Sequence, residues 1–336
     1  MASPGDAAAV AASCLLRIDE ERAVDVIRRN LAEAVSRTGV TGVLLGLSGG
    51  IDSALLAALA VRGLGRDAVH VAYLFDRDSG RSLALNVRRV ADWLGIRLER
   101  VSIEAAVRER GAYDSAVTRL TRLSPLVGRL LHAAYRAIAG ETPFVSSLRA
   151  GAGGDGGAGR AAAIRKAIGA YSGQGFDIRH RYRREYLEVL ASDRGWVLLG
   201  AANRSEWKIG WFVDGGVDGL PLPTQPIAGL YKTQVRQLAG FLGVPERVRT
   251  QPPSPDMMKG FTDEYGLGMS YSKIDLALDR IEGGVSDDDL ATAGVTDRDV
   301  EWVREMVGLS AWKRIGESAG FVVDGGPGGG LRVGMS

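Results

Sequence analysis

The sequence predicts an α/β protein with a doubly wound, mostly parallel sheet, a helical insertion and a C-terminal extension. Three observations predict this fold. Short apolar runs alternate with segments of helical periodicity, a glycine-rich turn joins the first strand to its helix, and 46% of the 336 residues are hydrophobic, which suffices for a large core. In such sheets ligands bind at the carboxyl ends of the strands. We therefore expect functional residues in the turns that follow strands.

The elements follow one another in a regular order along the chain. A helix is expected over residues 19–37 because Ile27, Leu31 and Val35 recur on one face, with charged residues elsewhere. Further helices are expected at residues 54–61, 82–94, 184–192 and 230–242, the last ended by Gly243, and buried strands at residues 42–47, 69–75, 96–101 and 196–199.

Two segments depart from this alternation. Between about residues 108 and 170 the pattern loosens. The formal G-x-G-x-x-G within this segment has no strand leading into it, so a flexible linker is expected at residues 151–159. The glycine-rich residues 318–336 are expected to form a flexible tail. The organisation predicted is a single domain over residues 1–317 with a glycine-rich, partly flexible insertion at about 108–170.

Charge and cysteine content exclude several classes of protein. The 42 basic and 40 acidic residues give a net charge of +2, which does not favour a nucleic-acid partner. Cys14 stands alone, so neither an intramolecular disulfide nor a C-x-x-C site is possible. Neither a membrane-spanning apolar run nor a signal-peptide pattern is found. We expect a cytoplasmic protein without membrane or nucleic-acid partners.

The turn after the first strand carries the strongest chemical signal. It reads Gly46, Leu47, Ser48, Gly49, Gly50, Ile51, Asp52 and Ser53. Two glycines let the backbone approach an anion, Ser48 and Ser53 add hydroxyl donors, and the helix dipole favours negative charge, so the turn is suited to phosphate. A carboxylate beside phosphate needs a cation between them, which predicts that Asp52 is a Mg²⁺ ligand.

Two other interpretations of this turn are possible. Residues 46–50 match the G-x-S-x-G elbow of α/β-hydrolases, which needs an acid and then a histidine downstream. The histidines are His70, His132 and His180, and the last lies in the basic run 177–184, where an imidazole is a poor base. The turn could also be purely structural. A Walker-type phosphate loop is absent from the sequence.

The second half of the chain supplies partners for Asp52. Residues 200–206 follow a strand, so Glu206 is expected at the same sheet edge, where two carboxylates could hold Mg²⁺ against a triphosphate. Lys232, at the start of a helix, is placed to meet phosphate. Singly, such an acid is often a helix cap and such a lysine is usually solvated. Their combination favours a site.

The phosphate turn resembles the pyrophosphate-binding loop of the N-type ATP pyrophosphatases, which cleave ATP between the α- and β-phosphates. Together with Leu-Tyr-Lys-Thr-Gln-Val at residues 230–235, it makes the chain similar to the ammonia-using NAD⁺ synthetase family from about Ile18 to Glu317. The resemblance implies an adenine nucleotide alpha hydrolase-like fold, ATP as co-substrate and Mg²⁺. It also implies adenylation of the deamido-NAD⁺ carboxylate, followed by amidation with ammonia.

The resemblance also implies the site residues. ATP or pyrophosphate would be bound by residues 46–53, Ala201, Lys232 and Ser254. The metal would be held by Asp52 and Glu206, and the catalytic residues would be Asp52, Glu206 and Lys232. The acid substrate would be faced by Arg181, Asp218, Trp312 and Lys313. Residues 262–264 and 267–271 match a segment that closes over substrate in the family.

Departures from the family pattern concern mainly the acid substrate. Ala201 stands where the family usually has threonine, which removes a hydroxyl contact to ATP. Residues 212–214 shorten a run that usually contains a lysine facing deamido-NAD⁺, and Trp312 replaces a histidine. The resemblance therefore supports the reaction type more strongly than the substrate.

The same resemblance implies partners. No glutaminase domain fits in the chain, so free ammonia or a separate amidase is implied, and a homodimer is expected, with the apolar helix faces at residues 19–37 and 184–192 as its contacts. Three alternatives stay open: adenylation of another carboxylic acid, a tRNA-modifying relative using the basic residues 179–184, and a non-catalytic nucleotide-binding homologue marked by Ala201. The lack of sulfur-carrying cysteines disfavours the second, and intact Asp52 and Glu206 disfavour the third.

Overall fold

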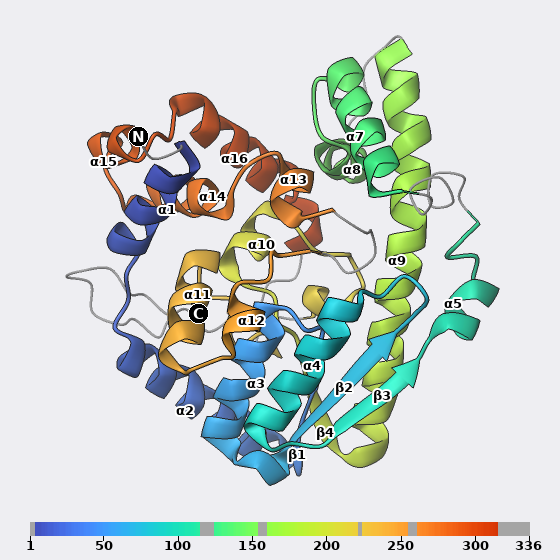
Figure 1. The fold of residues 1–336 in the computed structure, drawn as a ribbon, viewed down its shortest axis with the longest axis vertical. Coiled ribbons are helices and arrows are strands. Elements are labelled where there is room, and N and C mark those ends of the chain that lie inside the picture. The colour runs from blue at the N-terminus through green and yellow to red at the C-terminus, as the bar shows by residue number, and fades with distance from the viewer. Residues whose placement is uncertain (1–3, 115–123, 154–159, 221–223, 255–260, 315–336) are drawn as a thin grey trace.

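A parallel sheet forms the base of the molecule (Figure 1). The structure, a computed structural model, describes residues 4–114, 124–153, 160–220, 224–254 and 261–314. Within these ranges the strands are β1 (Gly42–Gly46), β2 (Val69–Phe75), β3 (Leu98–Ser102) and β4 (Trp196–Leu199), in the order β3-β2-β1-β4. All three pairings are parallel. The strand order reverses between β1 and β4, and at such a switch point the carboxyl ends of the strands open a ligand crevice.

Helices cover both faces of the sheet, which confirms the doubly wound arrangement. Leu45 and Val71 pack among residues of α2 (Glu20–Thr38), α3 (Ile51–Leu64) and α4 (Arg81–Leu94). The alternate residues Leu44 and Ala72 face the other way and pack with Leu187 of α9 (Arg160–Arg194).

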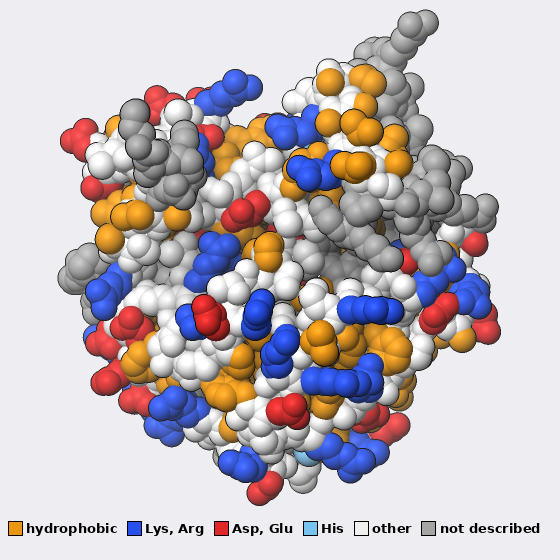
Figure 2. Space-filling view, viewed as in Figure 1, with side chains coloured by type: hydrophobic (Ala, Val, Ile, Leu, Met, Phe, Trp, Pro, Cys, Tyr) orange, Lys and Arg blue, Asp and Glu red, His pale blue; other side chains and the backbone are white. Residues whose placement is uncertain are grey.

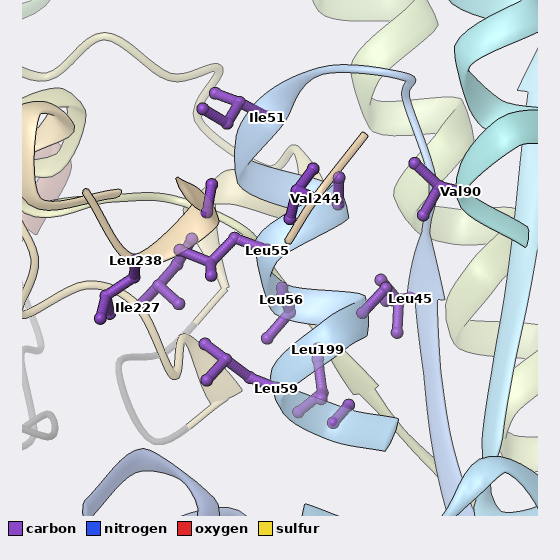
Figure 3. Close-up of a cluster of buried hydrophobic side chains, with 14 of the residues drawn as sticks. Leu45, Ile51, Leu55, Leu56, Leu59, Val90, Leu199, Ile227, Leu238 and Val244 are labelled. Atoms are coloured by element: carbon purple, nitrogen blue, oxygen red, sulfur yellow. The ribbon is translucent and has the colours of Figure 1, made fainter. Parts of the chain in front are cut away.

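The main core lies between the sheet and α3. Figure 3 shows Leu45 and Leu199 of the strands beside Leu55, Leu56 and Leu59 of α3, in the cluster that Leu238 of α11 (Lys232–Phe241) also joins. Because this packing anchors α3 and α11 on the same face of the sheet, it fixes the starts of both helices near the switch point.

A second, helical layer lies beyond the carboxyl edge of the sheet. It contains α1 (Pro4–Leu15), α8 (Pro143–Gly151), α13 (Asp263–Leu267), α14 (Tyr271–Ile281), α15 (Asp287–Thr292) and α16 (Asp297–Leu309). Its own apolar cluster includes Tyr271, Ile274 and Leu278 of α14. The remaining elements are η1 (Arg66–Ala68), α5 (Glu104–Glu109), α7 (Pro125–Ala139), α10 (Arg204–Ile209), η2 (Val217–Gly219), α12 (Glu246–Arg249) and η4 (Ala311–Arg314).

The structure agrees with the predicted strands and with most of the predicted helices. Residues 184–192 were expected to continue a helix whose start was not predicted; in the structure this helix, α9, begins at Arg160. Glycines at 169, 173 and 175 obscured it, because each costs about 1 kcal/mol in a helix interior and weakens the sequence signal.

The structure confirms the predicted helical insertion, since α7 and α8 both lie within residues 108–170. Ser124 caps α7 and Thr142 caps α8, and a proline follows each cap at the first helical position. These start signals were present in the sequence. Of the expected linker at 151–159, Gly151 ends α8 and residues 154–159 lie outside the described ranges, as does the expected tail at 318–336. None of the helices in the described ranges has the length and apolar character needed to cross a membrane.

Candidate functional site

The turn between β1 and α3 has the backbone of an anion-binding loop. Gly49 has φ +84°, and a Cβ there would lie 2.4 Å from the carbonyl oxygen of Leu83, so only glycine fits. Ser53 Oγ accepts a hydrogen bond from the Ser48 amide at 3.2 Å and lies 3.0 Å from Ser48 Oγ. Gly50 precedes α3 without a side-chain cap on its first turn. The backbone amides in the first turn of α3 therefore remain available to bind an anion at the positive end of the helix.

Three other loop residues have structural surroundings. Leu47 and Ile51 are buried in the core, and a Cβ on Gly46 would lie 3.3 Å from Leu187. The Leu47 amide donates to the carbonyl of Ala72 at 2.9 Å. These contacts tie the loop to the sheet and fix where Ser48 and Gly49 lie.

A buried charged centre lies at the switch point. The Lys232 ammonium donates to Asp52 Oδ2 at 2.6 Å and to Glu206 Oε1 at 2.8 Å, and only 1% of its side chain is exposed. Asp52 follows β1, Glu206 follows β4, and Lys232 begins α11, which packs on α3 and α10. The structure thus brings together the three residues predicted to be catalytic, one of them 180 positions from another.

The centre carries more acid than base. Asp218 and Asp263 join Asp52 and Glu206 around the Lys232 ammonium. Burial, reinforced by Asp52 and Asp263 and opposed by Lys232, raises the pKa of Glu206 to about 8. Burial likewise raises the pKa of Asp218 and of Asp263 to about 6. Burial alone would lower the pKa of Lys232, but Asp52 and Glu206 raise it overall, so the ammonium stays charged. Such a cluster is stabilised by a further cation.

Two residues that organise this centre were not among the predicted site residues. Asn203 is fully buried; its Nδ2 donates to Asp52 Oδ1 at 2.8 Å, and its Oδ1 accepts from the Glu206 amide at 3.0 Å. The hydroxyl of Tyr271 lies 3.1 Å from both Glu206 Oε1 and Asp263 Oδ2. The spacing of Asn203 and Glu206 signals a helix cap, and Tyr271 ends the expected closing segment 267–271. Nothing in the sequence indicated that Asn203 reaches Asp52.

Two of the residues predicted to face the acid substrate border one segment. Arg181 of α9 donates from Nε to the carbonyl of Asp214 at 3.0 Å. Lys313 donates from Nζ to the carbonyls of Gly210 and Phe212, the first at 2.9 Å. Burial lowers the pKa of Lys313 to about 8, and the nearby carboxylates of Asp177 and Asp214 partly oppose this shift. Both basic groups therefore meet around the shortened run at residues 212–214.

The other predicted residues are spread around the centre. Asp218, in η2, is close enough to the charged centre that Asp52 adds to the rise in its pKa caused by burial, while Lys232 opposes that rise. Trp312 donates from its indole nitrogen to the carbonyl of Leu148 in α8 at 3.2 Å, an anchoring contact.

Ala201 is partly exposed between β4 and α10. Ser254 follows Pro253, whose carbonyl accepts from the Asp263 amide at 2.9 Å, and so lies near the start of α13.

The histidines do not complete a hydrolase triad with Ser48. His70 lies at the amino end of β2, stacked on Trp196 with ring centroids 3.5 Å apart. His132 packs against the aromatic rings at the start of α13. Burial and neighbouring arginines lower the pKa of His180 to about 3. The hydrogen bonds described for Ser48 involve Ser53 and the loop backbone.

Comparison with known proteins identifies the family and the fold of this chain. Residues 23–137 and 171–316 match the family described as NAD synthase. The NH(3)-dependent NAD(+) synthetase of Thermotoga maritima is 31% identical over 282 residues, covering 83% of this chain and 92% of the relative. That of Mesorhizobium japonicum is 33% identical over 296 residues, covering 85% and 90%.

Solved structures share the fold. NMN synthetase from Francisella tularensis aligns with a TM-score of 0.62 at 20% identity, over 89% of this chain and 97% of that one. An NH3-dependent NAD synthetase from Campylobacter jejuni aligns with a TM-score of 0.59 at 19% identity, over 88% and 96%. At these identities the likeness concerns the arrangement of strands and helices.

Proposed function

Since the chain belongs to the NAD synthase family, we propose that it is an ATP-dependent ligase that converts deamido-NAD⁺ to NAD⁺ with ammonia. The observation that carries this function is the position of the Lys232 ammonium between Asp52 and Glu206, beside a loop whose amides can receive pyrophosphate. ATP is the co-substrate, and the products are AMP, pyrophosphate and the amide. The carbon–nitrogen bond is formed after the acid has been activated.

A Mg²⁺ ion held by Asp52 and Glu206 fits the residues present. Carboxylate oxygens are the ligands that Mg²⁺ prefers, and it takes one or two of them together with phosphate oxygens. The raised pKa of Glu206 reflects burial among other acids, and a cation there would relieve that excess of negative charge. When bound, the ion would neutralise charge between these carboxylates and the triphosphate.

Activation of the acid is the first step. An oxygen of the substrate carboxylate attacks the α-phosphorus of ATP, and the bond from that phosphorus to the bridging oxygen of the β-phosphate breaks, so pyrophosphate departs with the electron pair. We assign to the amides and hydroxyls of residues 48–53, and to the Lys232 ammonium, the stabilisation of the charge on this leaving group.

Amide formation is the second step. The nitrogen lone pair of ammonia attacks the acyl carbon, AMP leaves with the electrons of the acyl–oxygen bond, and the nitrogen loses a proton. This chemistry needs positioned reactants and no protein nucleophile. The site accordingly depends on geometry and charge, which Asp52, Glu206 and Lys232 provide.

The remaining assignments concern binding. We assign Arg181, Asp218, Trp312 and Lys313 to the acid substrate, and Ala201 and Ser254 to ATP. Arg181 and Lys313 support this assignment because both cations donate to backbone carbonyls of residues 212–214. The Lys313 ammonium already donates to two backbone carbonyls. It would therefore attract the acid substrate mainly through its positive charge, because two of its hydrogen-bond donors are already in use. Trp312 would act through its ring face, since its indole nitrogen is engaged by Leu148.

A homodimer in the cytoplasm, supplied with free ammonia or by a separate amidase, completes the proposal. The contacts first expected for the dimer are wrong in position: Ile27 and Leu31 of α2 pack into the core, and Leu187 of α9 packs on the sheet. The exposed apolar side chains of α7 support the dimer instead (Figure 2); they are Leu126, Leu130, Leu131 and Ile138. Large exposed apolar surfaces mark interaction sites.

Product analysis tests the function directly. Purified protein with ATP, Mg²⁺, ammonium and millimolar deamido-NAD⁺ should form NAD⁺, AMP and pyrophosphate in equal amounts. A matched panel of other carboxylic acids should release little pyrophosphate. Release with another acid, without NAD⁺ from deamido-NAD⁺, would establish the rival substrate. Absence of ATP cleavage with every acid would establish a non-catalytic homologue.

A further inference from the structure

A buried carboxylate lies directly behind the charged centre. Asp275 of α14 is fully buried and contacts neither Asp52 nor Lys232 Nζ among its described hydrogen bonds. Its Oδ1 accepts from the hydroxyl of Ser205, and its Oδ2 accepts from the amide of Thr233 at 2.8 Å and from the hydroxyl of Thr233 at 2.6 Å. Ser205 immediately precedes Glu206, and Thr233 immediately follows Lys232.

These bonds form one continuous chain with a defined direction. The Lys232 amide donates to Ser205 Oγ at 2.8 Å, so that hydroxyl is free to give its own proton to Asp275. Three donors thus converge on the Asp275 carboxylate, and a fourth, the Lys232 amide, donates to the Ser205 hydroxyl that the carboxylate orients. A buried carboxylate is tolerated only when it is hydrogen-bonded in this way. The network joins the first turns of α10 and α11 to the middle of α14.

A second residue of α14, Tyr271, contacts the charged centre directly. Tyr271 lies four residues before Asp275, so both side chains project from one face of the helix. The Tyr271 hydroxyl lies 3.1 Å from Glu206 Oε1. Glu206 is therefore held at its carboxylate by Tyr271 and at its backbone by the bonds of Asp275 to the neighbouring Ser205.

We propose that Asp275 is a positioning residue, which sets the separation and orientation of Glu206 and Lys232 by fixing the starts of α10 and α11. The inference rests on the proposed function, since its consequence is the rate of adenylation. Replacement by asparagine keeps the size of the side chain but turns one acceptor oxygen into an NH₂ donor, which cannot serve Ser205 and Thr233 together. One helix start then shifts. Shifts of about 1 Å cost up to about a hundredfold in rate without removing substrate contacts.

Steady-state kinetics of Asp275→Asn, Ser205→Ala, Thr233→Val and the control Asp279→Asn test this inference. Asp279 lies one turn further along α14, and its described side-chain hydrogen bond, from the Val285 amide at 2.8 Å, does not reach α10 or α11. We expect Asp275→Asn to lower kcat about ten- to a hundredfold, with the KM for ATP and for deamido-NAD⁺ changed less than about threefold. Ser205→Ala and Thr233→Val should show smaller losses of the same kind, and Asp279→Asn should keep the kcat of the unaltered protein.

The outcomes separate this inference from the proposed function. If the unaltered protein makes NAD⁺ and Asp275→Asn retains its kcat, or loses no more than Asp279→Asn, the positioning role is wrong. A rise in KM with unchanged kcat contradicts it as well. If Asp275→Asn does not fold, Ser205→Ala and Thr233→Val decide the matter by the same criterion. An unaltered protein without NAD⁺ synthesis would instead overturn the proposed function.

Discussion

The side-chain amide of Asn203 joins Asp52 to the start of the helix that carries Glu206. Its Nδ2 donates to Asp52 Oδ1 at 2.8 Å while its Oδ1 accepts from the Glu206 amide at 3.0 Å. The asparagine therefore both caps α10 and orients the first carboxylate of the charged centre. A donor is needed on one side and an acceptor on the other, and the asparagine amide offers them on two separate atoms.

Asn203→Asp should separate these two roles. Aspartate caps a helix as well as asparagine does, so the stability of α10 should be kept, but the Asp52 side then meets a second acceptor and a second negative charge. We expect kcat/KM for ATP to fall at least about tenfold, the value of one lost charge-assisted bond. Steady-state kinetics with thermal unfolding as the fold control measure this. Unchanged kinetics would show that the contact with Asp52 has no part in activity.

Loss of either carboxylate should stop ATP cleavage while the fold remains. Asp52→Ala and Glu206→Ala each remove a proposed metal ligand near the sheet edge, and we expect AMP and pyrophosphate release to fall at least about a hundredfold at saturating Mg²⁺. Asp25→Ala, on the exposed side of α2, is the control with an acid removed elsewhere. Near-normal release by Asp52→Ala or Glu206→Ala would make the metal assignment wrong.

The charged centre should make stability fall as pH rises in the absence of Mg²⁺ and ATP. The pKa of Glu206 is raised from 4.5 to about 8, so between these values the folded protein binds more protons than the unfolded chain. The stability that this group contributes is thus present below about pH 4.5 and is lost as pH rises to about 8. Asp263 acts in the same direction between 3.8 and about 6.

Urea denaturation at pH 5.5 and pH 8 measures this effect. The difference between the two unfolding free energies should shrink in Glu206→Gln, which cannot ionise, and in the unaltered protein when Mg²⁺ and ATP are added. An equal pH response in Glu206→Gln would locate the titration elsewhere.

Arg181→Ala should weaken the binding of the acid substrate more than the binding of ATP. Arg181 borders residues 212–214 and donates to the Asp214 carbonyl, whereas ATP is assigned to the loop at residues 48–53. A charge-assisted contact is worth about 1.5–3 kcal/mol, so the KM for deamido-NAD⁺ should rise roughly ten- to a hundredfold with little change for ATP. Arg184→Ala, which removes an arginine paired with Glu188 on the same helix, is the matched control. Equal rises for both substrates would contradict the assignment.

The dimer proposal predicts a specific surface. Sedimentation at micromolar concentration should show a dimer, and Leu126→Glu with Leu130→Glu should shift it toward the monomer, because charge on an apolar contact opposes its burial. Val10→Glu, at an exposed apolar position on α1, should leave the dimer intact. A fully active monomer at micromolar concentration would overturn the proposal.

Local features of the sequence determined the strands, the helices around them and the phosphate loop. Apolar periodicity depends only on near neighbours, so β2 and β4 were predicted at their observed bounds. The loop was predicted from its glycines. The structure gives the physical reason for one of them, because Gly49 adopts a positive φ beside Leu83, where only glycine fits. The start of helix α9 was not predicted, because its glycines weaken the local signal, while packing against the sheet stabilises the helix.

Tertiary structure alone decided which polar groups meet. Asp52 and Lys232 are 180 positions apart, and only the strand order β3-β2-β1-β4 brings the turns after β1 and β4 to the same crevice. The sequence by itself indicated each as a candidate, but not that Asn203 bridges to Asp52 or that Asp275 holds the residues beside Glu206 and Lys232. Such contacts depend on how distant elements pack against one another. Local propensities do not encode the distance between two side chains that are far apart in the sequence and meet only in the folded protein.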